Sequence, residues 1–135
     1  MVPENALLAA SALHVGFQAV VTLVVYPALA DVPATLWSTA HAAHSRRITA
    51  VVAPVYVAVG AACLWALVSL PSTVPLLLAV GGHVLAGVVT AAVAAPTHSR
   101  LGRQGVTPVV MRRLVRADRV RLLGALLALG AAPFV

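Results

Sequence analysis

The sequence predicts an all-α integral membrane protein, an antiparallel four-helix bundle with a short interfacial helix between its first two spans. Of the 135 residues, 61% are hydrophobic and only 9% are charged, and the mean hydropathy is +1.02. A soluble domain is about half apolar and about a quarter charged. Because a bilayer is an apolar solvent for outward-facing side chains, we interpret residues 1–135 as one membrane domain.

Four apolar runs are each near the roughly 20 residues that cross a bilayer. They cover residues 6–29, 48–70, 74–95 and 109–134. The uncharged turn LPSTVP joins the second run to the third, and such short turns make consecutive helices antiparallel neighbours. The fourth run begins with the basic stretch VVMRRLVRADRVR, whose arginines are expected to reach headgroups or face a wet interior.

The segment ADVPATLWSTAHAAHS, between the first two spans, predicts the short interfacial helix. Proline is favoured at the first position of a helix, which suits Pro33. Tryptophan is enriched where a membrane meets water, which suits Trp37.

All nine basic residues are arginines, against three acids, for a net charge of +6. Every arginine lies in the connection between spans 1 and 2, in that between spans 3 and 4, or in the first turns of span 4. These regions share one side of the membrane, which the positive-inside rule makes cytoplasmic. We therefore expect a multi-pass protein of the bacterial inner membrane, with both termini outside. The lysine-free, Ala- and Arg-rich composition is typical of a high-GC bacterium.

No aromatic or Gly-rich surface accompanies the basic charge, so the expected partners are membrane lipids and not nucleic acid. Whether the chain forms a homo-oligomer is left undecided by the sequence.

Polar side chains within the spans are the most informative residues of such a chain. Plotted at 100° per residue, each of the first three spans has one polar face, and we expect these faces to point inward. They either hydrogen-bond the helices together or line a cavity for a lipophilic substrate. The expected substrate-binding residues are Gln18, Tyr56, Arg47 and Arg119.

Three histidines are expected at the cytoplasmic end of the bundle. His41 and His44 are three residues apart and share a helix face, and His98 directly follows the third span. Three imidazoles suit a zinc, iron, copper or manganese ion, and an interfacial polar cap is the alternative. The predicted catalytic set is His41, His44, His98, Asp118 and Tyr26, with the three histidines as metal ligands.

His14 and His83 lie about two turns inside the outer ends of their spans, and so at similar depth. Two histidines at one depth are typical of bis-histidine haem ligation. An ordinary contact between the two side chains, or one with Gln18, is the alternative.

Asp118 stands among arginines in LVRADRVRLLG. It is expected to neutralise Arg121, three residues away, or Arg47 across the bundle. The alternative role is that of a general acid or base whose pKa those arginines set.

The motifs FQAVVTLVVYPAL, HAAHSRRI, VVAPVY, AAPTHSRLG and RLVRADRVR give the chain a layout that resembles small four-span bacterial membrane proteins. The span pattern, with Tyr-Pro at the end of the first span, is similar to the anthrone-oxygenase-like family. The resemblance implies oxidation of a lipophilic aromatic or polyketide substrate, and it assigns no active-site residue.

Three classes of function stay open. The first is a membrane enzyme acting on a lipophilic molecule, with a metal as Lewis acid or oxygen activator or with a His–Asp pair transferring protons. Chemistry of the oxidoreductase or oxygenase type fits this class. The second is a module that binds haem or a quinone. The third is a non-catalytic structural or accessory membrane protein.

Overall fold

Four long helical rods and no strand make up the structure, a computed structural model that describes residues 1–135. Rod 1 joins α1 (Pro3–Val20), the π-turn η1 (Val21–Val25) and α2 (Tyr26–Ala30). Rod 2 joins the 3-10 turn η2 (Ala34–Leu36) and α3 (Trp37–Ser69). Rod 3 joins α4 (Val74–Val89), the π-turn η3 (Thr90–Ala94) and α5 (Ala95–Gln104). Rod 4 joins α6 (Pro108–Ala131) and the 3-10 turn η4 (Ala132–Phe134).

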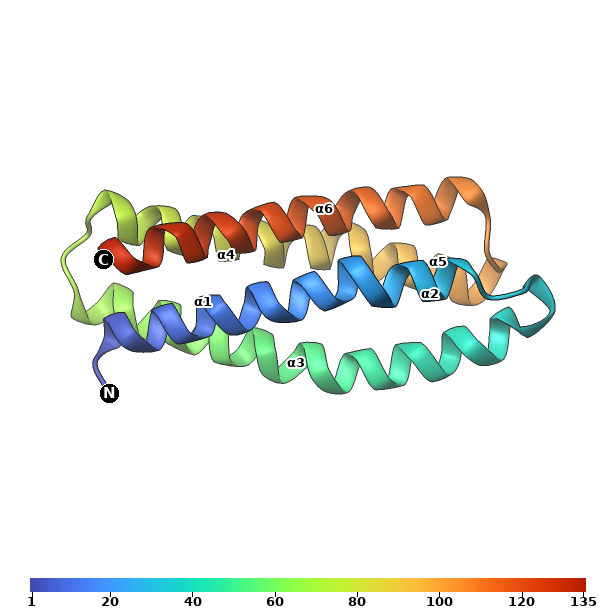
Figure 1. Ribbon diagram of the computed structural model, residues 1–135, viewed down its shortest axis with the longest axis horizontal. Helices are drawn as coiled ribbons and strands as arrows, with labels where there is room; N and C mark the ends of the chain where they lie inside the picture. Colours follow the sequence, from blue (N-terminus) through green and yellow to red (C-terminus); the bar gives the residue numbers. More distant parts are fainter.

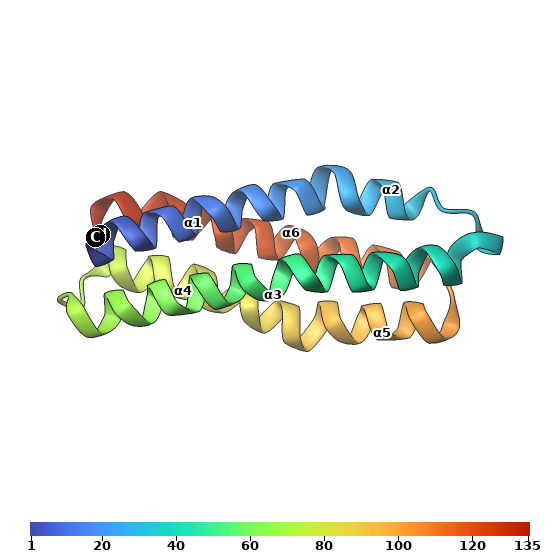
Figure 2. The same cartoon turned by 90° about the horizontal axis from the view of Figure 1, so that it is seen from below.

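The rods are antiparallel, and both termini lie at one end of the bundle (Figure 1). α1 packs against α3 and α6, and α4 packs against α6 and α3. The first and third rods therefore run in the same direction at diagonal corners (Figure 2). We call the end with the termini the terminal end, and the opposite end the arginine end.

Three rods are long and apolar enough to cross a membrane, namely Pro3–Ala30, Ala34–Ser69 and Val74–Gln104. This supports a multi-pass membrane protein. The many large apolar side chains on the outside of the bundle, such as Leu23, Val57 and Leu123, are at least 65% exposed, as expected where lipid is the solvent. α6 is not among the three because arginines occupy its first half.

The structure corrects the expected short helix between spans 1 and 2. Residues 37–47 form the first turns of α3, which runs unbroken for 33 residues. Neither glycine nor proline occurs among these residues, so nothing stops the helix at the membrane surface. At about 1.5 Å per residue, α3 is roughly 50 Å long, against about 30 Å of hydrocarbon. This helix is therefore longer than a crossing of the hydrocarbon requires.

The two π-turns have a common cause. Each ends two residues before a proline, Pro27 or Pro96. Tyr26 and Ala95 donate their backbone N–H five residues back, to Val21 and Thr90. A wider turn relieves the clash between a proline ring and the carbonyl four residues earlier. Each π-turn inserts one residue into the helical register and so rotates everything beyond it.

The two π-turns stand at equivalent places in rods 1 and 3. His14 and His83 are 69 residues apart, and Pro27 and Pro96 are separated by the same interval. The two rods thus repeat the order histidine, π-turn, proline, which the sequence alone did not establish as a repeat.

α4 and α6 approach most closely at two glycines, Gly82 and Gly124. A Cβ atom on Gly82 would lie 2.4 Å from the carbonyl oxygen of Gly124, and one on Gly124 would lie 2.7 Å from that of Gly82. Only glycine permits this backbone contact, which is typical of small-residue packing between membrane helices.

The interior has two apolar clusters with polar side chains between them. One cluster, which includes Leu7, Val59 and Leu76, fills the terminal end. The other, which includes Val21, Leu101 and Leu114, fills the arginine end. The polar layer between them positions the candidate site.

Candidate binding site

A buried hydrogen-bonded group joins α1 and α6 in the middle of the bundle. Gln18 donates from its amide nitrogen to Oδ1 of Asp118 and accepts at its amide oxygen from Nη2 of Arg121, at 3.0 Å. Thr22 donates to Oδ2 of Asp118 at 2.6 Å. Nη2 of Arg121 lies 3.8 Å from Oδ1 of Asp118, and the side chains of this ion pair are 5% and 1% exposed. Such a pair persists in an apolar interior because each charge is compensated and hydrogen-bonded.

Arg121 is not fully satisfied by these partners. Its Nε is buried and has no hydrogen-bond partner, and its side chain lines a cavity of about 260 Å³ that is partly open to the outside at Thr49. An arginine carries five N–H donors in a fixed plane. The guanidinium therefore has more N–H donors than partners in the protein, and its side chain borders this cavity.

The cavity is apolar on most of its wall and polar at a few points. Its hydrophobic lining comes from the first three rods, and its polar lining comes from Arg121 of α6, Tyr26, His98 and three hydroxyl side chains. The lining residues are Phe17, Val21, Tyr26, Ser45, Ile48, Thr49, Val52, Thr90, Ala94, Ala95, His98 and Arg121. A mostly apolar pocket with a few convergent polar groups is typical of small-molecule sites, although 260 Å³ is near the lower end of their sizes.

A row of aromatic side chains leads from the cavity to the arginine end. The Tyr26 hydroxyl is 3.3 Å from Nε2 of His98, and Nδ1 of His98 is 3.4 Å from Nε2 of His41. His41 stacks on Trp37 at a centroid distance of 5.2 Å, and the Trp37 indole donates to the carbonyl oxygen of Leu101 at 3.0 Å. Trp37 thus fixes His41 against α5, and His41 in turn contacts His98.

The three histidines expected to cluster, His41, His44 and His98, meet in space at the arginine end. The His44 ring stacks on the His98 ring at 5.6 Å, and its centroid is 6.4 Å from that of His41. Metal ligation requires ring nitrogens that converge on one point about 2.0–2.1 Å away. His41 Nε2 and His98 Nδ1, at 3.4 Å, have about the spacing of two nitrogens on a tetrahedral ion, but His44 presents a ring face to His98. No group of three or more His, Cys, Asp or Glu side chains is arranged to hold a metal ion.

His14 and His83 form a direct pair across the diagonal of the bundle. Their Nδ1 atoms are 2.9 Å apart, and the rings stack with centroids 5.1 Å apart. Nε2 of His83 also lies 2.9 Å from the Ser11 hydroxyl. In bis-histidine haem the iron and its porphyrin lie between two ring nitrogens, and two nitrogens in hydrogen-bond contact leave no such space. The pair does not fit haem, and it is an ordinary buried contact.

Tyr56 lies between the histidine pair and the cavity. Its ring meets the His14 ring edge-on at a centroid distance of 5.2 Å, and its hydroxyl is 2.7 Å from that of Thr90, a residue of the cavity wall. Tyr56 therefore orients Thr90 and does not itself line the cavity.

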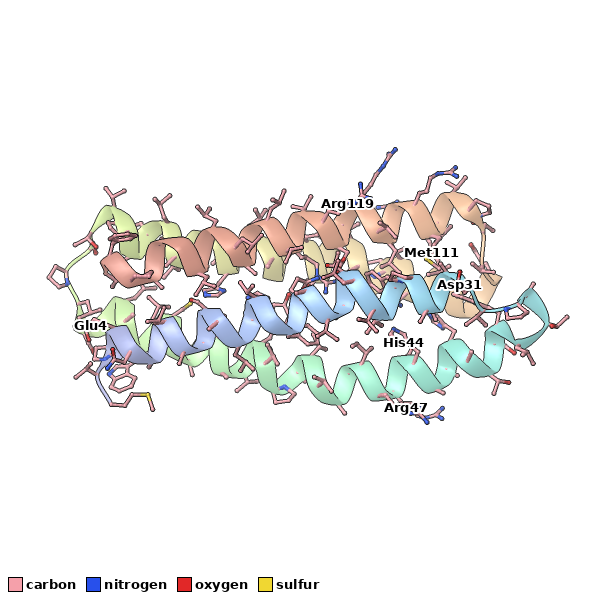
Figure 3. All side chains as sticks on the ribbon, in the orientation of Figure 1. Glu4, Asp31, His44, Arg47, Met111 and Arg119 are labelled. Carbon is pink, nitrogen blue, oxygen red and sulfur yellow. The ribbon has the colours of Figure 1, made fainter.

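Arg47 and Arg119, expected to bind substrate, are exposed on the outside of the bundle. Figure 3 shows both side chains pointing away from the interior, whereas His44 points between α2 and α3. The prediction that Arg119 lines the polar interior is corrected by these positions, because Arg121 occupies that place. Arg121 is three residues from Asp118 and so shares its helix face, whereas Arg119 is adjacent to Asp118 and points elsewhere.

The sequence therefore missed Arg121 as a cavity residue, although it paired Arg121 with Asp118. It also missed Thr22 as a partner of Asp118 and Ser11 as a partner of His83. The three-residue spacing of Asp118 and Arg121 was the signal that could have identified Arg121 as an inward-facing residue. Nothing in the chain order indicated the other two contacts, which depend on how the rods pack.

Comparisons with known proteins give no relative from which to transfer a function: no family model, no curated protein and no solved structure matches this chain.

Proposed function

We propose that this protein is a small integral membrane enzyme that binds a lipophilic molecule inside its bundle and transfers protons to or from that molecule. All four rods cross the membrane in this proposal, with the arginine end in the cytoplasm and both termini outside. The arginines of α6 are compatible with a crossing. Cα–Cβ bonds tilt toward a helix N-terminus, so the outward arginines of α6 extend toward the cytoplasmic headgroups.

The observation that carries the proposal is the cavity with Arg121 in its wall. Its apolar lining suits a hydrocarbon ring system, and its 260 Å³ suits one or two fused rings. The free donor capacity of Arg121 suits an oxygen that is negative or becomes so during reaction. Charge-assisted hydrogen bonds in a dry site are strong, so a phenolate, enolate or carboxylate is the expected chemical group.

Tyr26, His98 and His41 supply a route for the proton. When Tyr26 gives its hydroxyl proton to the bound oxygen, Nε2–H of His98 can reprotonate Tyr26. In the same concerted step His98 accepts a proton at Nδ1 from Nε2 of His41, and His41 takes one at its own Nδ1 from water at the arginine end, so each ring stays neutral and hydroxide is left in the water. The same relay running in reverse removes a proton from the bound molecule. General acid–base catalysis of this kind contributes about 10²- to 10⁴-fold in rate.

A continuous transport path is a poorer match. The polar side chains end at Ser11 and His83, and beyond them the apolar cluster of Leu7, Val59 and Leu76 closes the terminal end. A metal-dependent oxidoreductase is the second candidate, and the 3.4 Å separation of His41 Nε2 from His98 Nδ1 favours it. In that case the ion would act as a Lewis acid or oxygen activator beside the cavity.

The test uses hydroxynaphthoquinone, a two-ring acid whose visible absorption differs between its neutral and anionic forms. We expect the detergent-purified chain to bind the anion, measured by equilibrium dialysis against empty micelles. Asp118→Asn/Arg121→Gln removes the charge of Arg121 together with its buried carboxylate partner, so no unpaired charge is left in the interior. We expect affinity to fall about 10- to 100-fold, the worth of one charge-assisted contact of about 1.5–3 kcal/mol. Arg119→Gln removes an exposed charge from the same helix and is the matched control.

Equal losses of affinity in Asp118→Asn/Arg121→Gln and Arg119→Gln would count against the cavity as the site, because only general electrostatics would remain. Metal analysis of the same samples separates the two candidates. A stoichiometric ion that is lost in His41→Ala would replace proton transfer by metal chemistry.

A further inference from the structure

A second concavity lies on the outside of the bundle, away from the cavity described above. It is a groove of about 590 Å³ between the third rod and α6. The first half of α6 supplies Arg112, Arg113 and Arg116, and the third rod supplies Val89 and Val93. Val109, Ala117 and Val120 complete the lining. The groove is thus apolar along one wall and strongly basic along the other.

No carboxylate compensates these arginines. Asp118 is buried and paired with Arg121, Glu4 is near the terminal end, and Asp31 is at the end of α2 (Figure 3). Arg112, Arg113 and Arg116 are all exposed, and none makes an ion pair. An uncompensated cationic wall of this kind suits an anion from outside the chain.

The depth of the groove defines that anion further. Gly82 of α4 packs on Gly124 of α6, so the groove lies closer to the arginine end than this contact, along the outer face that meets lipid in a membrane. The apolar strip of Val89, Val93 and Val120 runs toward the bilayer centre, and the arginines stand on the headgroup side. Helical side chains lean toward the N-terminus of their helix, which places the guanidinium groups of α6 toward the headgroups.

We propose that this groove is a binding site for an anionic glycerophospholipid. The phosphate contacts Arg113 and Arg116, with Arg112 at the rim, and one acyl chain lies along the valine strip. This inference needs the chain to lie in a membrane but is independent of what the internal cavity binds.

A second copy of this chain is a poorer occupant. Two such faces meeting across a two-fold axis would bring six arginines together, and like charges at close range repel. The exposed carboxylate of Asp31 cannot offset them, because it is one charge against three in each copy.

The test is native mass spectrometry of the full chain in detergent, with palmitoyl-oleoyl phosphatidylglycerol competing against the zwitterionic phosphatidylcholine of the same chains. We expect the wild type to bind phosphatidylglycerol more tightly than phosphatidylcholine. Each basic side chain near a membrane surface contributes roughly a four- to sixfold gain in binding to anionic lipid. Arg113→Gln/Arg116→Gln should therefore weaken phosphatidylglycerol binding about 20- to 30-fold.

The matched control is Arg46→Gln/Arg103→Gln, which removes two exposed charges outside the groove and should change affinity less than about threefold. Val93→Trp keeps every charge but fills the groove. It should weaken binding of the intact lipid, acyl chains included, while leaving binding of glycerol phosphate unchanged. Circular dichroism establishes that each variant is folded. Equal weakening by the two double variants, or a wild type without preference for phosphatidylglycerol, would overturn the proposal. So would a change of oligomeric state in the groove variants without a change in lipid binding.

Discussion

Replacing Arg121 by methionine is expected to destabilise the bundle by about 3–5 kcal/mol. The substitution leaves the carboxylate of Asp118 buried without its cation, and an uncompensated buried charge is among the most costly single changes in a folded protein. Asp118 is 1% exposed and Arg121 is 4% exposed, so water cannot take the place of the lost partner. Unfolding in mixed micelles, followed by circular dichroism, measures the change in free energy.

A double-mutant cycle tests whether the lost ion pair causes this destabilisation. Asp118→Asn should be destabilising by a similar amount, because it leaves the Arg121 guanidinium unpaired. Asp118→Asn/Arg121→Met removes both charges, and we expect it to be more stable than either single variant, since neutral replacements of a buried ion pair are often tolerated. Additive losses would show that the two side chains act independently, contrary to the contacts through Gln18.

Gly82→Ala should also have a large effect, a loss of about 3 kcal/mol. The new Cβ would lie 2.4 Å from the carbonyl oxygen of Gly124 and 2.9 Å from the backbone nitrogen of Ala128. Both are backbone atoms, so α4 and α6 must separate along their whole contact. Overpacking of this kind typically costs 1–3 kcal/mol and occasionally more.

Gly81 provides the matched control for this substitution. It is the preceding residue of the same helix, and a Cβ there meets nothing within 4 Å. Gly81→Ala should leave stability unchanged or raise it by up to about 1 kcal/mol, the difference in helix propensity. If the two alanine variants unfold alike, α4 and α6 do not meet closely at Gly82.

The four-helix architecture was predictable from the sequence because apolar runs and a one-sided arginine distribution report directly on membrane crossing. The helix boundaries at the arginine end were not. Residues 37–47 carry polar side chains, which indicate a surface, but nothing in them breaks a helix, so α3 continues through them. Whether a helix continues and whether its residues lie inside the membrane are separate questions, and hydropathy answers only the second.

The candidate site was predictable in part. Gln18 and Tyr26 belong to a polar face that a 100° plot identifies, and His98 and Asp118 stood out as a clustered histidine and a carboxylate among arginines. The structure places all four in or beside one layer. Such a plot assumes a regular helix, and the π-turns before Pro27 and Pro96 break that assumption. The cavity itself could not be predicted, because its walls come from all four rods and depend on how they pack.

The central claim is that the cavity beside Arg121 holds a lipophilic oxygen-bearing molecule. The most direct measurement is a crystal structure with a brominated hydroxynaphthoquinone, whose bromine is located by anomalous scattering. We predict a single strong peak inside the bundle, in the space bounded by Arg121, Tyr26 and His98, with the ring oxygen toward the guanidinium. A bromine peak only on the lipid-facing surface, or none at a probe concentration that saturates binding in dialysis, would contradict it.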